Sequence, residues 1–396
     1  MDQKTKPLLV KCSSIYTKNK LISGGIYIDN KVIQSVFEEE ELKNIKEKNI
    51  NIITLPKQFK IIPGMIDLHI HGLMGIDTMD CDIQGFSKMC KFLPSEGVTS
   101  YLATTITSAP DIIQKTLLLI KEFLKIKTYS GATLLGINLE GPFISKDKAG
   151  AHNKELIVDS NVELFKEWQD FSGNNIKIVT IAPEMPGAFN FIQEVRDNVI
   201  LSLGHTNCSY ETACEAIKEG VRLATHLFNA MSGIDHRCPG AALAVLNSDT
   251  ISAEIIVDKF HLNEVVVKFI YKVLGGNRII LVSDAMRAKG LGPGVYEFGG
   301  KKIVVDQFTA RLTDGTLAGS LLKLNNAAKN MMDITTCSLE DIVKMTSENP
   351  AKLLKIYDRK GSIEIGKDAD LVVIDENFNI AMTVCMGEIV YNKNIQ

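Results

Sequence analysis

Eight candidate strands, most of them near-continuous apolar runs, alternate with helical patterns in the middle of the chain and restrict its fold more than any other feature. Runs without polar alternation are typical of strands buried on both faces of a parallel sheet. The helical patterns carry end signals: residues 263–276 begin with a capping Asn and close with Gly-Gly. Eight strand–helix units over ~300 residues are typical of a (β/α)8 barrel. The expected strands are residues 61–71, 97–105, 133–140, 176–183, 199–206, 223–230, 251–258 and 279–286.

Both ends of the chain have the pattern of short strands with polar turns. Residues 24–37 are expected to form a hairpin that turns at Asp29-Asn30, and residues 369–392 close the chain with a similar pattern. Because chain termini usually lie close together, the two ends are expected to form one discontinuous unit. We therefore predict an α/β fold with two domains. A small β-sandwich domain would combine residues 1–60 with 361–396, and residues 61–360 would form the barrel.

Charge and apolar patterning narrow the expected partners. Forty-four Lys and Arg against 47 Asp and Glu give a net charge of -3, which does not favour a nucleic-acid partner or an anionic membrane. No apolar run reaches the ~18 residues of a membrane span, and the apolar stretch near the N-terminus is too short for a signal-peptide core. The eight cysteines form no CxxC pair, which favours reduced thiols. A cytoplasmic protein is expected.

Polar side chains stand at the ends of the expected strands, where a barrel of this type places its chemistry. His69 and His71, two positions apart, lie on the same side of the first strand. Glu140 ends the third strand, and a buried carboxylate there needs a cation or hydrogen bonds. A lone strand histidine is more often a core residue than a ligand, but the whole set favours a shared site. The other members are His152 after the third strand, His205, His226, Asp258 with His261 beyond it, and Asp284.

One divalent cation shared by Glu140, His205 and His226 explains three of these placements. Such a ligand set leaves an open position for water, whose pKa the cation lowers to about 7. The resulting hydroxide can attack an amide or ester carbonyl. Asp284 can take the water's proton and then deliver it to the leaving amine. The residues therefore predict metal-assisted hydrolysis.

Residues 294–314 break the alternation of strands and helices. They have the pattern of a β-hairpin with a turn at Gly299-Gly300. Because the segment follows the eighth strand, it either forms a wall or cover of the active site or decorates the surface.

The seventh histidine, His236, has no expected role.

Short motifs occur along nearly the whole chain. PGMIDLHIHG lies at residues 63–72, VSDA at 282–285 and GSIEIGKDADLVVID at 361–375. By these motifs the chain resembles the amidohydrolase superfamily. A narrower group makes it similar to the N-acetylglucosamine-6-phosphate deacetylase family within that superfamily. That group is LEGPF (139–143), GAHN (150–153), LGHT (203–206), THLFNAM (225–231) and LAGS (317–320).

The resemblance implies a role for each residue of the site. Glu140, His205 and His226 would bind the metal. Asp284 would be the catalytic acid and base, and His152 would polarise the acetamide carbonyl. In related enzymes a phosphate ligand can come from the neighbouring subunit, so a homodimer is implied. Arg237 and His261 would hold the 6-phosphate, and Ala151, Asn229, Ala230, Leu317, Ala318 and Gly319 would line the sugar and acetyl pocket.

The implied reaction converts N-acetyl-D-glucosamine 6-phosphate to D-glucosamine 6-phosphate and acetate, in amino-sugar catabolism or cell-wall recycling. The implied partner is thus a small phosphorylated amino sugar. Two alternatives stay open. One is another amidohydrolase activity on a related amide, such as N-acetylgalactosamine 6-phosphate. The other is an inactive barrel that serves as an interaction scaffold, although such relatives usually lose the metal ligands that this chain retains.

Three features bear on the number of metal ions and on the phosphate pocket. The fourth strand ends without the lysine that bridges two metals in many amidohydrolases, so Glu140 would take that place. His69 and His71 are both present, so one or two ions are expected, and His and carboxylate ligands suit Zn²⁺, Fe²⁺, Mn²⁺ or Co²⁺. Lys259 and Phe260 precede His261 where a small residue and a Gly are more common.

Overall fold

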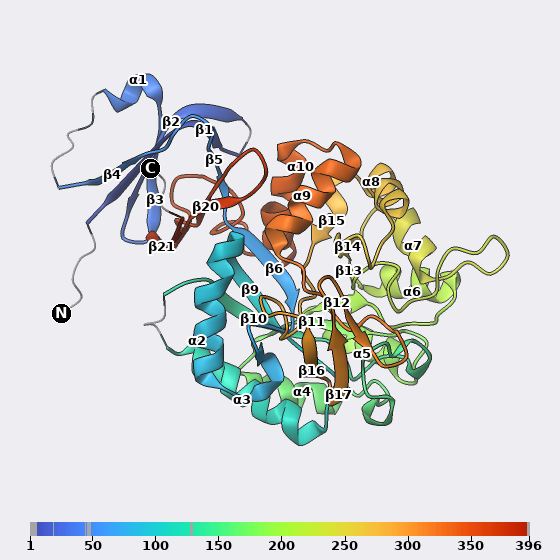
Figure 1. Ribbon diagram of the computed structural model, residues 1–396. Helices are drawn as coiled ribbons and strands as arrows, with labels where there is room; N and C mark the ends of the chain where they lie inside the picture. The colour runs from blue at the N-terminus through green and yellow to red at the C-terminus, as the bar shows by residue number, and fades with distance from the viewer. Residues whose placement is uncertain (1–5, 19, 44, 46–48, 127–129, 394–396) are drawn as a thin grey trace.

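The strands from both chain termini form one sheet in the computed structural model, which describes residues 6–18, 20–43, 45, 49–126 and 130–393. Figure 1 shows these strands gathered together, beside the barrel. The apolar side of the sheet buries its own core, which includes Ile26, Leu371 and Val384. In sheet order the strands are β21 (Glu388–Asn392), β20 (Ile380–Cys385), β19 (Leu371–Ile374), β5 (Lys60–Pro63), β1 (Leu8–Tyr16), β2 (Leu21–Asp29) and β3 (Val32–Glu38), with β4 (Asn51–Thr54) paired to β1.

Eight parallel strands in the middle of the chain form the barrel. Each pairs with its neighbour in sequence order, and the end of the first strand meets the segment after the last. There, the Asp284 N–H donates to the His69 carbonyl at 2.8 Å and the His71 N–H donates to the Ala285 carbonyl at 2.9 Å. The strands are β6 (Met65–Ile70), β9 (Val98–Thr105), β10 (Thr133–Leu139), β11 (Ile176–Ile181), β12 (Ile200–Leu203), β13 (Leu223–Ala224), β14 (Ser252–Ile255) and β15 (Ile279–Leu281).

Amphipathic helices cover the outside of the barrel (Figure 1). The expected capping Asn is confirmed, because the Asn263 side chain accepts from the Val265 N–H. Ser338 and Asp341 form a capping box at the start of another helix. The helices are α2 (Ile83–Phe92), α3 (Pro110–Leu124), α4 (Val162–Ser172), α5 (Ala188–Val195), α6 (Tyr210–Glu219), α7 (Ala241–Asn247), α8 (Glu264–Arg278), α9 (Leu324–Thr335), α10 (Leu339–Val343) and α11 (Asn349–Leu353), while α1 (Glu39–Leu42) follows β3. Shorter elements are β7 (Gly72–Leu73), β8 (Ile76–Asp77), η1 (Thr78–Asp80), η2 (Leu93–Glu96), η3 (Lys146–Lys148), η4 (Lys154–Leu156) and the π-helix η5 (Lys344–Glu348).

The segment after the barrel's last strand is a three-stranded antiparallel sheet of β16 (Gly294–Phe298), β17 (Lys301–Val305) and β18 (Ala310–Leu312). Gly299 and Gly300 form the expected turn, both with positive φ (58° and 74°), a conformation that two-residue hairpin turns require. The Phe298 ring packs edge-on against the His71 ring, with centroids 4.8 Å apart. The Lys301 Nζ donates to the His152 carbonyl at 2.8 Å. The hairpin therefore forms a wall next to the expected active site.

The expected fold class, a (β/α)8 barrel with a small β domain built from both termini, is confirmed. The division at residues 60 and 361 stays our proposal.

The first expected strand is two strands, because β5 (60–63) pairs in the terminal sheet and β6 (65–70) in the barrel. The hairpin turn expected at Asp29-Asn30 lies one residue later, at Asn30 and Lys31. Within the described ranges, no helix combines the length and apolarity that a membrane crossing requires.

Candidate metal-dependent active site

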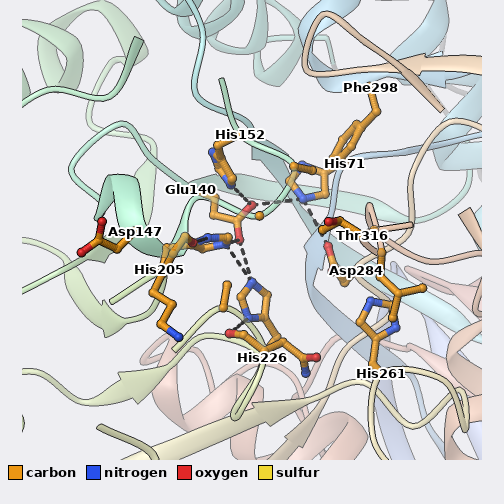
Figure 2. A pocket seen from close by; sticks show the side chains of 17 residues that line it. His71, Glu140, Asp147, His152, His205, His226, His261, Asp284, Phe298 and Thr316 are labelled. Carbon is orange, nitrogen blue, oxygen red and sulfur yellow. Dashed lines mark hydrogen bonds and ion pairs between the residues drawn. The ribbon is translucent and has the colours of Figure 1, made fainter. Parts of the chain in front are cut away.

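A pocket of about 290 Å³ opens at the C-terminal ends of the barrel strands (Figure 2). Parallel strands direct the segments that follow them to one end of a barrel, which is why side chains far apart in sequence meet here. Its lining combines imidazoles, two buried carboxylates and small loop residues. The lining residues are His71, Glu140, Asp147, Lys148, Gly150, Ala151, His152, His205, His226, Asn229, Ala230, His261, Asp284, Phe298, Thr316, Leu317 and Gly319.

Glu140, His205 and His226 form one group of possible metal ligands. The Glu140 Oε1 lies 3.1 Å from the His205 Nε2 and 3.0 Å from the His226 Nε2, and the two Nε2 atoms are 3.1 Å apart. Both histidines have positive φ (47° and 28°), which is uncommon for a residue with a Cβ. Such backbone strain persists where the surrounding structure fixes it, often at functional sites.

The hydrogen bonds on the far side of these two rings define what faces Glu140. The His205 Nδ1 lies 2.8 Å from the Lys148 carbonyl, and the His226 Nδ1 lies 3.1 Å from the Asn229 carbonyl. A carbonyl only accepts, so each Nδ1 carries the proton and each Nε2 presents a lone pair. Two lone pairs and a carboxylate then face one another without a proton between them. This donor set fits a divalent cation.

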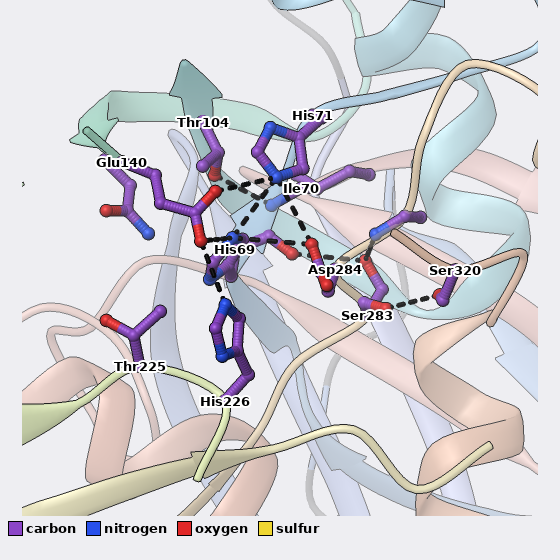
Figure 3. A network of polar contacts seen from close by, with 12 residues as sticks. His69, Ile70, His71, Thr104, Glu140, Thr225, His226, Ser283, Asp284 and Ser320 are labelled. Atoms are coloured by element: carbon purple, nitrogen blue, oxygen red, sulfur yellow. Dashed lines mark hydrogen bonds and ion pairs between the residues drawn. The ribbon is translucent and has the colours of Figure 1, made fainter. Parts of the chain in front are cut away.

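His69, His71 and Asp284 form a second group of possible ligands beside the first (Figure 3). The Asp284 Oδ1 lies 3.2 Å from the His71 Nε2 and 3.5 Å from the His69 Nε2. The two Nε2 atoms are 3.3 Å apart. The Glu140 Oε2, 3.2 Å from the His71 Nε2, joins the two groups, so that this carboxylate can serve both.

Charge at the site is set by burial and by these neighbours. Burial opposes ionisation of Glu140, but the neighbouring His69 and the hydrogen bond from the His152 Nε2–H outweigh burial and lower the Glu140 pKa well below its usual range. Burial also opposes ionisation of Asp284, yet His69 and His71 lower its pKa to about 2. Both carboxyl groups are therefore anionic at neutral pH.

His152 has a different environment from the four clustered imidazoles. The Thr107 N–H donates to its Nδ1 at 3.2 Å, and the Thr107 hydroxyl lies 2.7 Å from the same atom. An Nδ1 that accepts leaves the proton on Nε2, which lies 3.4 Å from the Glu140 Oε2. Burial and the nearby His205 lower the His152 pKa to about 4, so the ring is neutral. His152 thus presents a neutral N–H donor to the pocket.

Most of the sequence-predicted residues line the pocket, and three do not. His69 lies buried beneath the pocket, and Ala318 is fully buried behind its neighbours Leu317 and Gly319. Arg237 is exposed, outside the pocket, with its Nε donating to the His236 Nε2 at 3.1 Å. His261 lines the pocket, and its Nδ1 lies 2.7 Å from the Asp258 Oδ2.

Sequence reasoning missed several lining residues. Asp147 and Lys148 lie in the loop that precedes the GAHN motif, and no periodic pattern marks them. Phe298 stands at the Gly-Gly turn of the predicted hairpin, and Thr316 directly precedes the LAGS motif. For Phe298 and Thr316, the available signal was that each lies next to a predicted hairpin turn or motif.

Comparisons with known proteins agree with this geometry. The family model described as "Amidohydrolase family" matches residues 61–390. N-acetylglucosamine-6-phosphate deacetylase of Bacillus subtilis (strain 168) is 45% identical over 97% of both chains. The enzyme of that name from Lysinibacillus sphaericus is 41% identical over 84% of this chain and 86% of its own.

Solved structures give the same result. The crystal structure of N-acetylglucosamine-6-phosphate deacetylase from Thermotoga maritima has a TM-score of 0.86 and 34% identity, over 97% of this chain and all of its own. A mutant of the enzyme from Mycobacterium smegmatis, in complex with N-acetyl-D-glucosamine-6-phosphate, has a TM-score of 0.90 and 26% identity, over 98% of this chain and all of its own. The chain therefore belongs to the amidohydrolase family of hydrolases, within its N-acetylglucosamine-6-phosphate deacetylase branch.

Proposed function

We propose that this chain hydrolyses the acetamide of N-acetyl-D-glucosamine 6-phosphate to D-glucosamine 6-phosphate and acetate, in amino-sugar catabolism or cell-wall recycling. The observation that carries the proposal is the Glu140, His205 and His226 group, whose lone pairs converge beside Asp284 at the base of the pocket. The names of its relatives, 45% identical in the first case, supply the substrate.

Glu140, His205 and His226 would hold one divalent ion, and His69, His71 and Asp284 would contribute to a second. Zn²⁺, Fe²⁺, Mn²⁺ and Co²⁺ all suit these ligands. When bound, such an ion polarises a carbonyl oxygen and lowers the pKa of water to about 7. The protein's part is to fix the ligand tautomers, through the Lys148 and Asn229 carbonyls.

Asp284 would act first as base and then as acid. Its carboxylate lines the pocket and is anionic at neutral pH, so it can accept a proton from the attacking water. Once protonated, it can deliver that proton to the leaving amine of the sugar. The positive φ of Asp284 (46°) and the N–H bond to the His69 carbonyl fix the carboxylate at this place.

His152 would orient and polarise the acetamide. Its Nε2–H points into the pocket, and a neutral imidazole N–H is a suitable donor to a carbonyl oxygen that gains negative charge. Thr107 holds the ring in that tautomer from behind. Ala151, Asn229, Ala230, Leu317 and Gly319 would surround the sugar and the acetyl group, with Ala318 supporting the last two from below.

His261 and Arg237 would bind the 6-phosphate, with Arg237 reaching the pocket of a neighbouring subunit in a homodimer. An apolar hollow of about 530 Å³ beside His261 supports such an interface, since it includes the exposed Ile234, Val265 and Phe269. Arg237 lies three positions after Ile234, on the same exposed loop.

We also propose a cytoplasmic location, supported by the absence of disulfides among the described cysteines.

Acetate release from N-acetylglucosamine 6-phosphate, on protein of known metal content, tests the proposal. We expect turnover that stops on chelation and returns when metal is added, and much slower turnover of the unphosphorylated sugar. Remote phosphate contacts contribute to transition-state binding, which is the reason for that difference. A metal-loaded protein without turnover, or with faster turnover of N-acetylgalactosamine 6-phosphate, would contradict the proposed substrate.

A further inference from the structure

Glu254 is a buried carboxylate that the proposed mechanism does not use. It lies in β14, within the otherwise apolar run of the seventh barrel strand, and none of its surface is exposed. An ionised carboxylate in such a place is costly unless a charge or several hydrogen bonds compensate it. Its contacts therefore indicate what it does.

The main partner of Glu254 is His69. The Glu254 Oε2 lies 3.0 Å from the His69 Nδ1, and the His226 N–H donates to the same oxygen over a longer 3.4 Å. The other oxygen, Oε1, has no hydrogen-bond partner among the described residues. Glu254 thus connects both candidate ligand groups, and its one short contact is to the imidazole.

This contact decides which nitrogen of His69 carries the proton. A carboxylate accepts, so Nδ1 is protonated and Nε2 presents its lone pair toward the His71 Nε2, 3.3 Å away, and the Asp284 Oδ1, 3.5 Å away. Backbone carbonyls hold His205 and His226 in the same way. Among the Nδ1 atoms of these three imidazoles, only that of His69 has an ionisable partner in the described part of the chain.

Glu254 places a further carboxyl group, besides Asp284, next to the His69 and His71 group. A histidine that donates to a carboxylate is also a more basic metal ligand.

We propose that Glu254 is a positioning residue that makes His69 a ligand and thereby sets the affinity of the second ion, held with His71 and Asp284. This inference rests on the proposed metal dependence. The competing reading is that Glu254 only ties β14 to β6 across the barrel, in which case its loss would change stability without a selective effect on one ion.

The test is equilibrium metal binding by the full-length protein. Glu254→Gln keeps the shape and an acceptor oxygen but removes the charge, and Glu254→Leu removes both. Protein dialysed against graded free Co²⁺ is analysed for cobalt per subunit and for the visible absorption of the ion. We expect the dissociation constant of the weaker ion to rise by ~10–100-fold in Glu254→Gln, and further in Glu254→Leu, with the tighter ion retained.

Glu96→Gln is the matched control. Glu96 is also buried in the barrel and pairs with the Lys289 Nζ at 2.9 Å, without contact to the ligands, so this variant lowers stability alone. Equal weakening of both ions in the Glu254 and Glu96 variants, unchanged binding in Glu254→Gln, or a single ion in the unmodified protein would each overturn the inference. Two ions with no deacetylase turnover would instead overturn the proposed function and leave the role of Glu254 intact.

Discussion

Two buried groups of charge in this molecule are completed in opposite ways. Near the terminal sheet, the Lys360 Nζ lies 2.5 Å from the Asp370 carboxylate and 3.1 Å from that of Asp368, and all three side chains are buried. At the mouth of the barrel, Glu140 faces two imidazole nitrogens that, by their tautomers, also offer lone pairs. The first group, here called the closed group (Lys360, Asp368 and Asp370), contains its own cation. The second, called the open group (Glu140, His205 and His226, with Asp284 beside them), contains acceptors that converge on a place for a cation.

The difference separates structural charge from functional charge. Burial lowers the pKa of Lys360, but Asp370 and Asp368 outweigh it and raise that pKa, so the closed group stays charged and paired. The open group is arranged by backbone carbonyls and by a strained backbone at His205, His226 and Asp284. Buried charges that lack an internal counter-charge are therefore the better guide to chemistry in this fold.

The largest effect is expected from Asp284→Asn, which disables the open group while leaving its other ligands in place. Without a carboxylate to accept and return the proton, kcat for acetate release should fall by ~10²–10⁴-fold. Metal content per subunit, measured in parallel, distinguishes loss of proton transfer from loss of an ion. Turnover within a few fold of the unmodified protein would remove Asp284 from its acid and base role.

Lys360→Met should damage the closed group almost as severely, but through stability. The variant leaves Asp368 and Asp370 buried without their shared cation, and breaking such a pair costs about 3–5 kcal/mol. Urea unfolding followed by circular dichroism measures the loss. If the free energy of unfolding changes by less than about 1 kcal/mol, which is the usual effect of an exposed pair, the two groups do not differ as described.

Chelation should destabilise the folded protein by removing the ion that the open group holds. Removing an ion present at 100 times its dissociation constant lowers the free energy of unfolding by about 2.7 kcal/mol. The same treatment of a Glu140→Gln variant should have a much smaller effect, because Glu140 contacts both ligand groups. Equal melting temperatures of the unmodified protein with and without chelator would mean that the open group needs no ion.

Arg237→Ala should have the smallest effect, since Arg237 is proposed to act on the phosphate, away from the metal ligands. We expect KM to rise at least tenfold, which corresponds to about 1.4 kcal/mol of binding, with metal content unchanged. Mixing this variant with an inactive Asp284→Asn partner tests the shared pocket, because a mixed dimer restores one complete site. An unchanged KM would exclude Arg237 from phosphate binding.

The sequence predicted the eight barrel strands because most of them are near-continuous apolar runs, but it overestimated the length of several strands. Residues 223–230 were expected to be one strand, and β13 has only the first two residues. The rest bends through positive φ at His226, Phe228 and Ala230. An apolar sequence of this kind is compatible with a buried turn as well as with a strand. Here it forms a turn, and the turn directs His226 into the site.

Sequence reasoning could tell which residues lie close together where they end strands, but not where loops decide their position. The ends of parallel strands converge whatever their loops do, so His71, Glu140 and Asp284 could be grouped in advance. Phe298 and Thr316 reach the pocket only because of the path taken by the β16–β18 segment. Glu254 did carry a signal, as the one charged residue before the end of its apolar run, but its partner depends on the register across the barrel.

The seam where the barrel closes has a consequence for the order of events during folding. The chain segments that meet there are the ones that carry His69, His71 and Asp284, and the Ser283 hydroxyl donates across the seam to Asp67, 216 positions away. A growing or truncated chain that stops before the eighth strand therefore lacks Asp284 and cannot complete the second group of ligands. A second ion held by all three ligands thus requires that the two segments of the seam have met, so its presence marks a closed barrel.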